Sequence, residues 1–280
     1  MNLKIISAVL VLALASLACG FNVDLPERVT PGAEVKESIV VAGSGSAETR
    51  LTLSFGAGSL NLSPGAEGLV EGTAVYNVPA LKPEIIQSEG SVEIKQGGLK
   101  NIANFNDIKN QWDLKLGSAP LDLNINAGAY SGRFELGGLS LTSLTVKDGA
   151  AQVELSFAEP NLSEMSVLRY ETGASNVTLS GLANANFSTL MFAGGAGDYK
   201  LDFSGELKRD GTVDISAGAG NVHLVIPKSV NAKVTVDSAL ASVNFSSNWS
   251  QSGNTYIQNG SGPTLTIIVK MAAGTLTITD

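Results

Sequence analysis

The stretch ISAGAGNVHLVIP, residues 215–227, shows the pattern that decides the fold. Glycine and alanine separate two segments in which apolar and polar residues alternate, and this period of two is typical of half-buried β-strands. A glycine-rich phosphate loop is normally followed by a helix whose N-terminus faces the anion, whereas here the strand-like segment VHLVI follows. The stretch therefore predicts a bend within a strand and not a nucleotide site.

The same pattern recurs along the chain. The last apolar residue before each bend serves as an anchor, and the eight anchors are Leu53, Ile125, Val146, Tyr170, Phe192, Ile215, Val236 and Val269. Six of them are followed three positions later by a glycine, namely Gly56, Gly128, Gly149, Gly173, Gly195 and Gly218. An apolar residue returns seven positions after every anchor except Ile125, where Gly132 takes its place.

A step of seven is odd, so a flat strand would place the two apolar sets on opposite faces. The chain must bend between them, and one unpaired residue at the bend would restore the inward face. We expect glycine at these structural corners because it adopts positive φ without steric cost. The anchors from Ile125 to Val236 follow one another at nearly constant intervals, as expected for successive turns of a repeat. The sequence therefore predicts an all-β fold, a β-solenoid-like stack of Gly-Ala-cornered strand pairs with about 21–24 residues per rung.

Four segments are expected. They are a signal peptide (1–18), a lipid-anchored linker (19–40), an N-terminal β region (41–116) and a repetitive region (117–280) continuous with it. The gap from Leu53 to Ile125 is close to three turns long. The gap from Val236 to Val269 is longer than one turn and accommodates the polar loop SSNWSQSGNTYIQNGSGP.

The N-terminal residues MNLKIISAVLVLALASLACG predict export, because the apolar run over 5–18 is short for a membrane span and suits a signal peptide. Cys19, the only cysteine, follows Ser16 and Ala18 as in a bacterial lipobox, although that motif prefers leucine where Ser16 stands. We expect lipidation of Cys19, whose acyl chains would hold an extracytoplasmic lipoprotein to the membrane. Ordinary cleavage after Ala18, which would release a secreted protein, is the alternative.

Composition and charge argue against several classes of site. Charged residues make up 16% of the chain and the formal net charge is -8 without a basic stripe, which disfavours nucleic acid as a partner. The only histidine, His223, is expected to be an exposed strand residue, which leaves no catalytic triad or histidine metal site. The acidic residues fall at different distances from their anchors, so we expect an outward, solvated charge distribution and no catalytic carboxylate pair; they are Asp148, Glu154, Glu171, Asp198 and Asp202. The sequence predicts no enzyme activity, cofactor or metal.

The polar loop near the C-terminus holds the candidate ligand-binding residues. The rings of Trp249 and Tyr256 could stack on sugars, with Asn248 as an amide partner. Alternatively, Trp249 folds back over the final rungs as a cap and buries its apolar area. The sequence leaves both interpretations open.

The run ETRLTLSFGAGSLNLSPGAEGLVEGTAVYN and the later segments KPEI, NQWDLKL and LDLNINAGAYSGRFELGGLSLTSLTVKDGAAQVELSF resemble the bacterial toast-rack family. They also resemble the related LiaF-like cell-envelope proteins and adhesin-like proteins with the same GAG repeat. The resemblance covers about residues 45–227 and implies a stack of β-hairpin-like rungs on an envelope protein, without a defined activity. LiaF-like members act in the response to cell-wall-active antibiotics, but they usually carry membrane helices ahead of the β domain, where this sequence has a signal peptide.

Together these observations predict a non-enzymatic lipoprotein of the cell envelope that serves as a structural or adhesive binding module. Its expected partners are the membrane, through the N-terminal lipid, and a cell-wall glycan or another envelope protein. A regulatory protein of the envelope stress response and a carbohydrate-active β-helix enzyme are the competing hypotheses.

Overall fold

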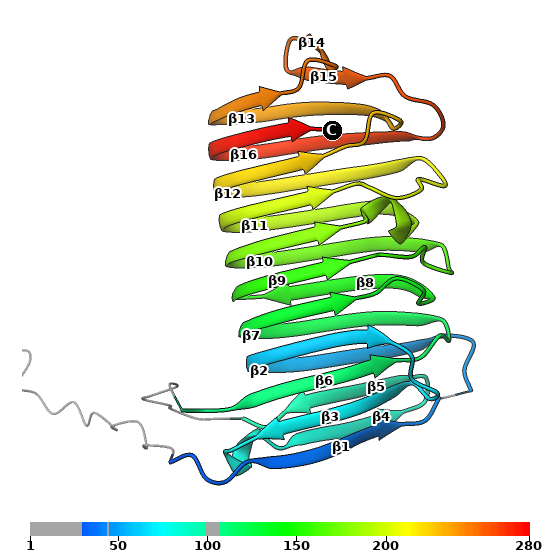
Figure 1. The fold of residues 1–280 in the computed structure, drawn as a ribbon, viewed down its shortest axis with the longest axis vertical. Coiled ribbons are helices and arrows are strands. Elements are labelled where there is room, and N and C mark those ends of the chain that lie inside the picture. The colour runs from blue at the N-terminus through cyan, green and yellow to red at the C-terminus, as the bar shows by residue number, and fades with distance from the viewer. Residues whose placement is uncertain (1–29, 44, 99–106) are drawn as a thin grey trace, which may run out of the picture.

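The computed structural model describes residues 30–43, 45–98 and 107–280. In these residues the chain forms a 16-stranded sheet with two short 3-10 helices (Figure 1), so the all-β prediction is confirmed. The signal peptide, Cys19 and the first part of the expected linker lie outside the described residues. No helix in the described part of the chain is long and apolar enough to cross a membrane.

The elements follow one another in this order: β1 Val35–Val41, β2 Thr49–Pro64, β3 Val70–Tyr76, η1 Pro79–Leu81, β4 Pro83–Ser88, β5 Ser91–Gln96, β6 Asn110–Leu116, β7 Leu121–Glu135, β8 Leu141–Asp148, β9 Ala150–Ser156, β10 Met165–Ser180, η2 Leu182–Ala185, β11 Phe187–Asp202, β12 Gly211–Val225, β13 Asn231–Phe245, β14 Ser250–Ser252, β15 Thr255–Gln258 and β16 Thr264–Thr279.

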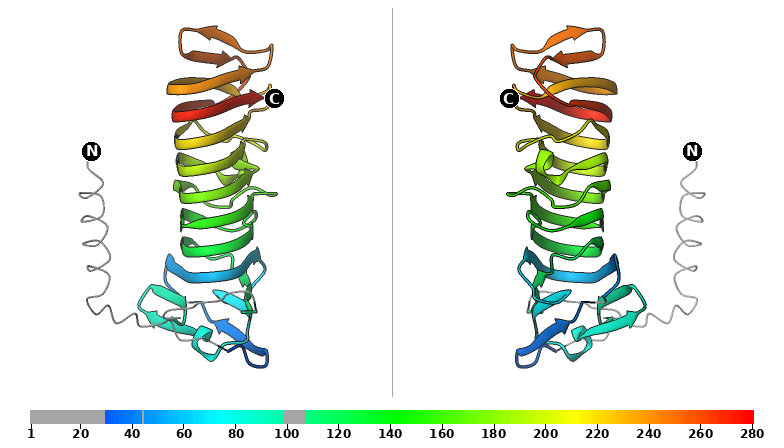
Figure 2. Two further views of the ribbon diagram at one scale, coloured as in Figure 1. Left: turned by 90° about the vertical axis from the view of Figure 1, so that its left-hand side faces the viewer. Right: turned by 90° about the vertical axis from the view of Figure 1, so that its right-hand side faces the viewer.

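Long bent strands stack in parallel and form a column, which Figures 1 and 2 show from three sides. Each rung of the column has two arms, one before and one after the Gly-Ala corner. The pair β8 and β9 together make one such rung, since β8 pairs with the first arm of β10 and β9 with the second. The rungs succeed one another in the order β2, β7, β8 with β9, β10, β11, β12, β16 and β13.

The predicted anchors form a single column of paired residues inside this stack. Tyr170 pairs with Val146 on one side and with Phe192 on the other, and Phe192 pairs with Ile215. The position seven residues after each anchor forms a second column in the same way, with Tyr199 beside Val222. Strand pairing thus aligns both arms of neighbouring rungs, as the repeat predicts.

The corner turns both arms inward. Phe192 and Tyr199 are seven residues apart, yet both side chains are buried and their ring centroids lie 5.0 Å apart. Pairing between β11 and β12 joins Gly194 to Ala217 and Ala196 to Ala219, passing over the corner position between them. One residue per rung is therefore left out of the ladder, which confirms the bend inferred from the odd step.

The exception at Gly132 has a packing reason. The space that a side chain at this position would fill is taken by the rings of Tyr130 and Phe134, which stack with centroids 6.3 Å apart. The core therefore continues through this rung although its apolar column is interrupted.

The order of the last two rungs differs from the chain order that the anchor spacing suggests. Ile215 pairs with Val269 and not with Val236, because β16 lies between β12 and β13 and pairs in parallel with both. The chain first forms the outermost rung β13, then the hairpin of β14 and β15, and returns to fill the vacant position with β16. The interval between Ile215 and Val236 matches the repeat, but it does not separate neighbouring rungs.

The long gap after Leu53 also differs from three regular turns. Strand β2 pairs directly with β7, and Leu53 lies beside Ile125. The intervening strands β3 to β6 lie on the other side of β2, where β3 and β1 continue the sheet in antiparallel pairing. Strand β1 begins at Val35, inside the range 19–40 expected to be a linker.

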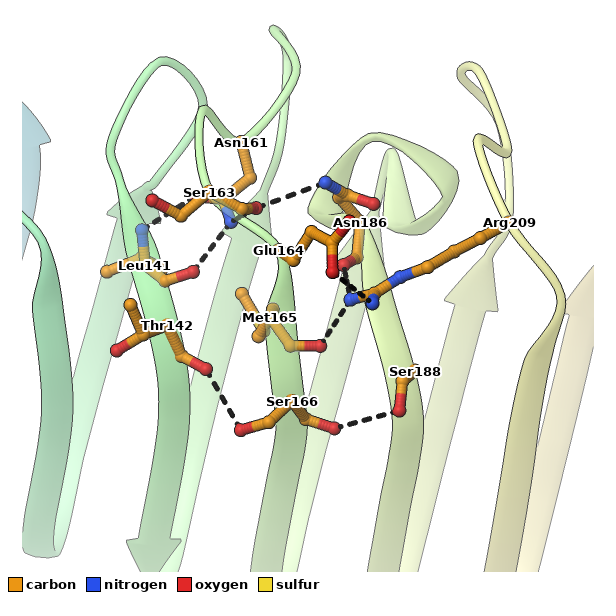
Figure 3. Close-up of polar contacts among 10 residues, drawn as sticks. All are labelled: Leu141, Thr142, Asn161, Ser163, Glu164, Met165, Ser166, Asn186, Ser188 and Arg209. Atoms are coloured by element: carbon orange, nitrogen blue, oxygen red, sulfur yellow. Dashed lines mark hydrogen bonds and ion pairs between the residues drawn. The ribbon is translucent and has the colours of Figure 1, made fainter.

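A seam of side-chain hydrogen bonds joins the first residues of β8, β10 and β11 (Figure 3). The Asn161 amide bonds both the backbone N–H and the carbonyl of Leu141, each at 2.8 Å. Arg209, from the loop after β11, reaches across the seam and donates to the carbonyls of Met165, at 2.7 Å, and Asn186. These bonds hold together the loop side of the column, opposite the corners.

Candidate functional site

The corner glycines do not have the positive φ that the sequence suggested. None of the six predicted corner residues is among the residues with positive φ in the described chain; those corner residues are Gly56, Gly128, Gly149, Gly173, Gly195 and Gly218. In this column a Cβ on Gly218 would lie 2.5 Å from the carbonyl oxygen of Gly195. Glycine is required there because the backbones of neighbouring rungs approach closely, not because of the torsion angle.

Positive φ occurs two positions later in some rungs. Gly58, Gly197, Gly220 and Gly274 have φ between 124° and 159°. A Cβ on Gly220 would also overlap the carbonyl oxygen of Gly197 in the next rung. This second column combines an unusual torsion with close packing between rungs.

Asp148 faces into the corner instead of outward, which corrects the expectation of scattered outward acids at this residue. Its carboxylate accepts hydrogen bonds from the hydroxyls of Tyr170, at 2.7 Å, Tyr130, at 3.3 Å, and Thr172. Burial raises the pKa of both tyrosines, and the Asp148 charge raises it further. The phenols are therefore neutral donors to a carboxylate already satisfied by hydroxyls, and the cluster provides a structural link between rungs and no activated nucleophile.

A sequence signal for this cluster existed. Asp148 and Thr172 each stand two positions after an anchor, and a period of two makes that position inward-facing. Their placement two positions after neighbouring anchors would have predicted that they meet inside the corner.

The predicted ligand-binding residues lie in the hairpin that closes the end of the column beyond β13. Trp249 and Tyr256 are both only 5% exposed, and the Tyr256 ring packs edge-on against Phe245 with centroids 5.0 Å apart. The Asn248 side-chain amide donates to the side-chain Oε1 atom of Gln258 at 2.5 Å. Stacking on sugars needs accessible ring faces, which these side chains lack, so their placement favours the cap interpretation.

A different candidate site lies beside a rung whose two arms are separate strands and are not joined by a Gly-Ala corner. Strand β5 pairs with the first arm of β2 and strand β6 with the second, so that Ile94 lies beside Leu53 and Trp112 beside Leu60. We call β5 and β6 the split rung. Strand β5 ends at Gln96 and β6 begins at Asn110, so the step of seven residues through a Gly-Ala corner does not join these two arms.

Two side-chain amides replace the missing backbone. The Gln96 carbonyl oxygen accepts the Gly56 N–H at 2.9 Å and the Ala57 N–H at 3.4 Å. The Asn110 amide donates to the Ala57 carbonyl and to the Gln96 carbonyl oxygen, both at 2.7 Å. Among the described residues, the corner of β2 is therefore hydrogen-bonded on this side by side chains and not by a further Gly-Ala corner.

Beside the corner of β2 lies a groove of about 900 Å³, which we call the corner groove. Its floor is the corner of three successive rungs, β2, β7 and β9, and its wall is the split rung. The lining residues are Gly56, Ala57, Gly58, Gln96, Gly97, Gly98, Ile108, Asn110, Ala129, Tyr130, Ser131, Ala150, Ala151 and Gln152. None of these residues carries a formal charge. Sequence reasoning did not find the groove, because its floor and wall meet only after folding.

The titratable groups offer little chemistry elsewhere. In the described ranges 30–43, 45–98 and 107–280, no three His, Cys, Asp or Glu side chains lie together as a metal site would require. His223 is partly buried and its Nε2 lies 2.8 Å from the Thr279 hydroxyl. Burial, followed by the nearby Lys200 charge, lowers its pKa.

Comparison with known proteins supports the resemblance seen in the sequence. The family model described as the N-terminal domain of toast-rack, DUF2154, matches residues 30–178. No curated protein matches the chain at a significant level.

Two solved structures were compared with the chain, both at low sequence identity. A candidate cell adhesion protein from Clostridium sporogenes is 23% identical, with a TM-score of 0.50 over 88% of this chain and 99% of that chain. A candidate adhesin from Bacteroides fragilis is 10% identical, with a TM-score of 0.40 over 88% of this chain and 97% of that chain. The likeness to the Clostridium protein concerns the fold.

Proposed function

The chain belongs to the toast-rack family by its N-terminal domain, and on this premise we propose that it is a non-enzymatic binding module anchored to the membrane on the extracytoplasmic side of the bacterial cell envelope. In this proposal lipid on Cys19 holds the protein to the membrane. The β-solenoid-like stack forms the body of the module, and the corner groove provides its ligand site. The description of the Clostridium structure as a cell adhesion protein agrees with this role.

The observation that carries the proposal is the combination of a hydrogen-bonded scaffold and a groove with an uncharged described lining. Seven spacings separate the eight rungs from β2 to β13, so the stack is roughly 34 Å long at about 4.8 Å per spacing. Both arms of every rung are hydrogen-bonded to a neighbour, which resists bending. The groove presents backbone corners, amides and hydroxyls that can bind a ligand, and its described lining residues include no carboxylate, imidazole, amine or thiol.

Display and anchoring can be tested by labelling cells with radioactive palmitate. We expect the wild-type chain to incorporate label and to be degraded by protease added to whole cells, after outer-membrane permeabilisation where an outer membrane is present. Cys19→Ala should lose the label and appear in the medium or periplasm. Label retained in Cys19→Ala would contradict the anchor.

The proposal also differs from the regulatory alternative in its phenotype. A deletion strain should lose binding to envelope material while keeping its tolerance to cell-wall-active antibiotics. Altered tolerance with unchanged binding would favour the stress-response hypothesis instead.

A further inference from the structure

We propose that the corner groove binds a neutral, N-acetylated saccharide. This inference rests on the proposed function, because it names the ligand class of that same site. It places sugar binding beside β2, toward the end of the column opposite β14 and β15 (Figure 1), whereas the sequence suggested Trp249, which directly precedes β14, for this role.

The absence of charge in the lining is the first argument. The described lining residues include no charged side chain, although the chain as a whole has a net charge of -8. A ligand carboxylate or phosphate would leave water without gaining a counter-charge, which is strongly unfavourable. The groove therefore favours uncharged ligands over nucleotides, fatty acids and acidic polymers.

The polar groups of the groove are the second argument. Gln152 and Ser131 are exposed at its edge, and the buried Asn110 lies in its wall. Amides and hydroxyls both donate and accept, as the hydroxyl and acetamido groups of a sugar do. The Asn110 Oδ1 atom is buried and has no donor among the described residues, and an unpaired buried acceptor is costly. Because this atom has less than 1 Å² of accessible surface, contacts with a ligand fall to the exposed Gln152 and Ser131, whose hydrogen bonds a plain acyl chain could not satisfy.

The floor of the groove is the third argument. Ala129 and Ala150 are exposed at the corners of adjacent rungs, with Ala57 and Ala151 half-buried beside them. Three rungs span two spacings, or roughly 10 Å, which is long enough for two linked sugar rings. The alanine methyl groups present a flat apolar surface to the C–H faces of the rings and to an acetyl methyl group.

The repeat supplies a matched pair of variants for the test. Ala129→Trp fills the groove from an exposed position, so the fold should tolerate it. Ala219→Trp makes the same change at the exposed, equivalent corner position of β12, which does not line the groove. The full chain, purified from membranes and held in nanodiscs, would be titrated with chitotriose, a neutral oligomer of N-acetylglucosamine, in a calorimeter.

We expect the wild type and Ala219→Trp to bind chitotriose with similar affinity. Ala129→Trp should weaken binding by roughly tenfold or more, a difference of about 1.4 kcal/mol. Gln152→Ala, another exposed change, should weaken it by a smaller factor. Circular dichroism of each variant would show that the fold is retained.

The outcomes separate the parts of the argument. Equal affinities of Ala129→Trp and Ala219→Trp would overturn the location of the site. Absence of chitotriose binding, or binding of an uncharged apolar peptide or a fatty acid in its place, would overturn the saccharide class. Neither result affects palmitate labelling or protease accessibility on cells. The proposed envelope function is therefore tested separately by those two measurements.

Discussion

Replacing Gly220 by alanine should destabilise the column strongly, because two separate effects coincide at this residue. Its φ of 124° is a conformation that side chains other than hydrogen rarely adopt, and holding alanine there costs about 1–3 kcal/mol. The added Cβ would also overlap the Gly197 carbonyl oxygen, which belongs to the backbone of the next rung and cannot rotate away. Displacing packed structure costs typically about 1–3 kcal/mol more, so the free energy of unfolding should fall by about 2–6 kcal/mol.

Two other glycines separate these effects. Gly253 has a φ of 61° but no atom within 4 Å of the position of a Cβ, so Gly253→Ala should incur only the torsional cost, about 1–2 kcal/mol. Gly43 has neither the torsion nor a close neighbour, and Gly43→Ala should be nearly neutral.

Urea denaturation would measure the differences. Repeat proteins can unfold in parts, so the two tryptophans provide useful local probes: Trp112 is in the split rung and Trp249 in the cap at the other end. Fluorine-labelled tryptophan gives each a separate NMR signal. Gly220→Ala should lower the midpoint reported by Trp249 at least as much as that reported by Trp112. If Gly220→Ala costs no more than Gly253→Ala, close approach between rungs is not what selects glycine at this position.

Three further changes follow from the contacts described above. The raised pKa of Tyr170 means that the folded state keeps a proton that the unfolded state loses above pH 10. The free energy of unfolding should therefore fall as the pH rises above 10. A pH series of urea midpoints should show a shallower fall for Tyr170→Phe. Arg209→Met should cost about 1–3 kcal/mol through the lost carbonyl bonds, whereas Glu164→Gln should be nearly silent in the same assay because the Glu164 side chain is 81% exposed. Truncation after Pro263 removes β16, the parallel neighbour of both β12 and β13. Both rungs should then show rapid hydrogen exchange while β7 stays protected. Protection retained in β13 would refute the order in which β16 lies between β12 and β13.

The regular part of the column could be predicted because every rung repeats the same sequence pattern. Alternation, the odd step and the recurring glycine together place Phe192 and Tyr199 on one side of a bend, and the structure pairs every anchor with another anchor. The reason for the glycines could not be predicted, since positive φ and close backbone approach both require the same residue. The structure distinguishes the two, because the corner glycines lack positive φ and a Cβ on Gly218 would lie 2.5 Å from the Gly195 carbonyl oxygen.

The departures from regularity were harder to predict for a different physical reason. A parallel ladder accepts any rung with the right pattern, so Ile215 could pair equally well with Val236 or Val269, and local sequence does not choose between them. The split rung was hidden because Ile94 and Trp112 occupy the two inward columns although they lie much farther apart along the chain than the usual step of seven. The corner groove depends on that split, and for this reason no motif marks it.

The inserted position of β16 also explains how the far end of the column is closed. A stack of rungs leaves core side chains uncovered at each end, and repeat proteins need a cap there. If β13 occupied the inner position, the loop over residues 246–263 would emerge between rungs and would have to pass β16 to reach the end. With β13 outermost, β15 pairs directly with Ala232 to Thr235, and Trp249 and Tyr256 cover the core beside it. The composition of the loop follows from this arrangement, because the two rings face the core while asparagine, serine and glycine form the outer surface.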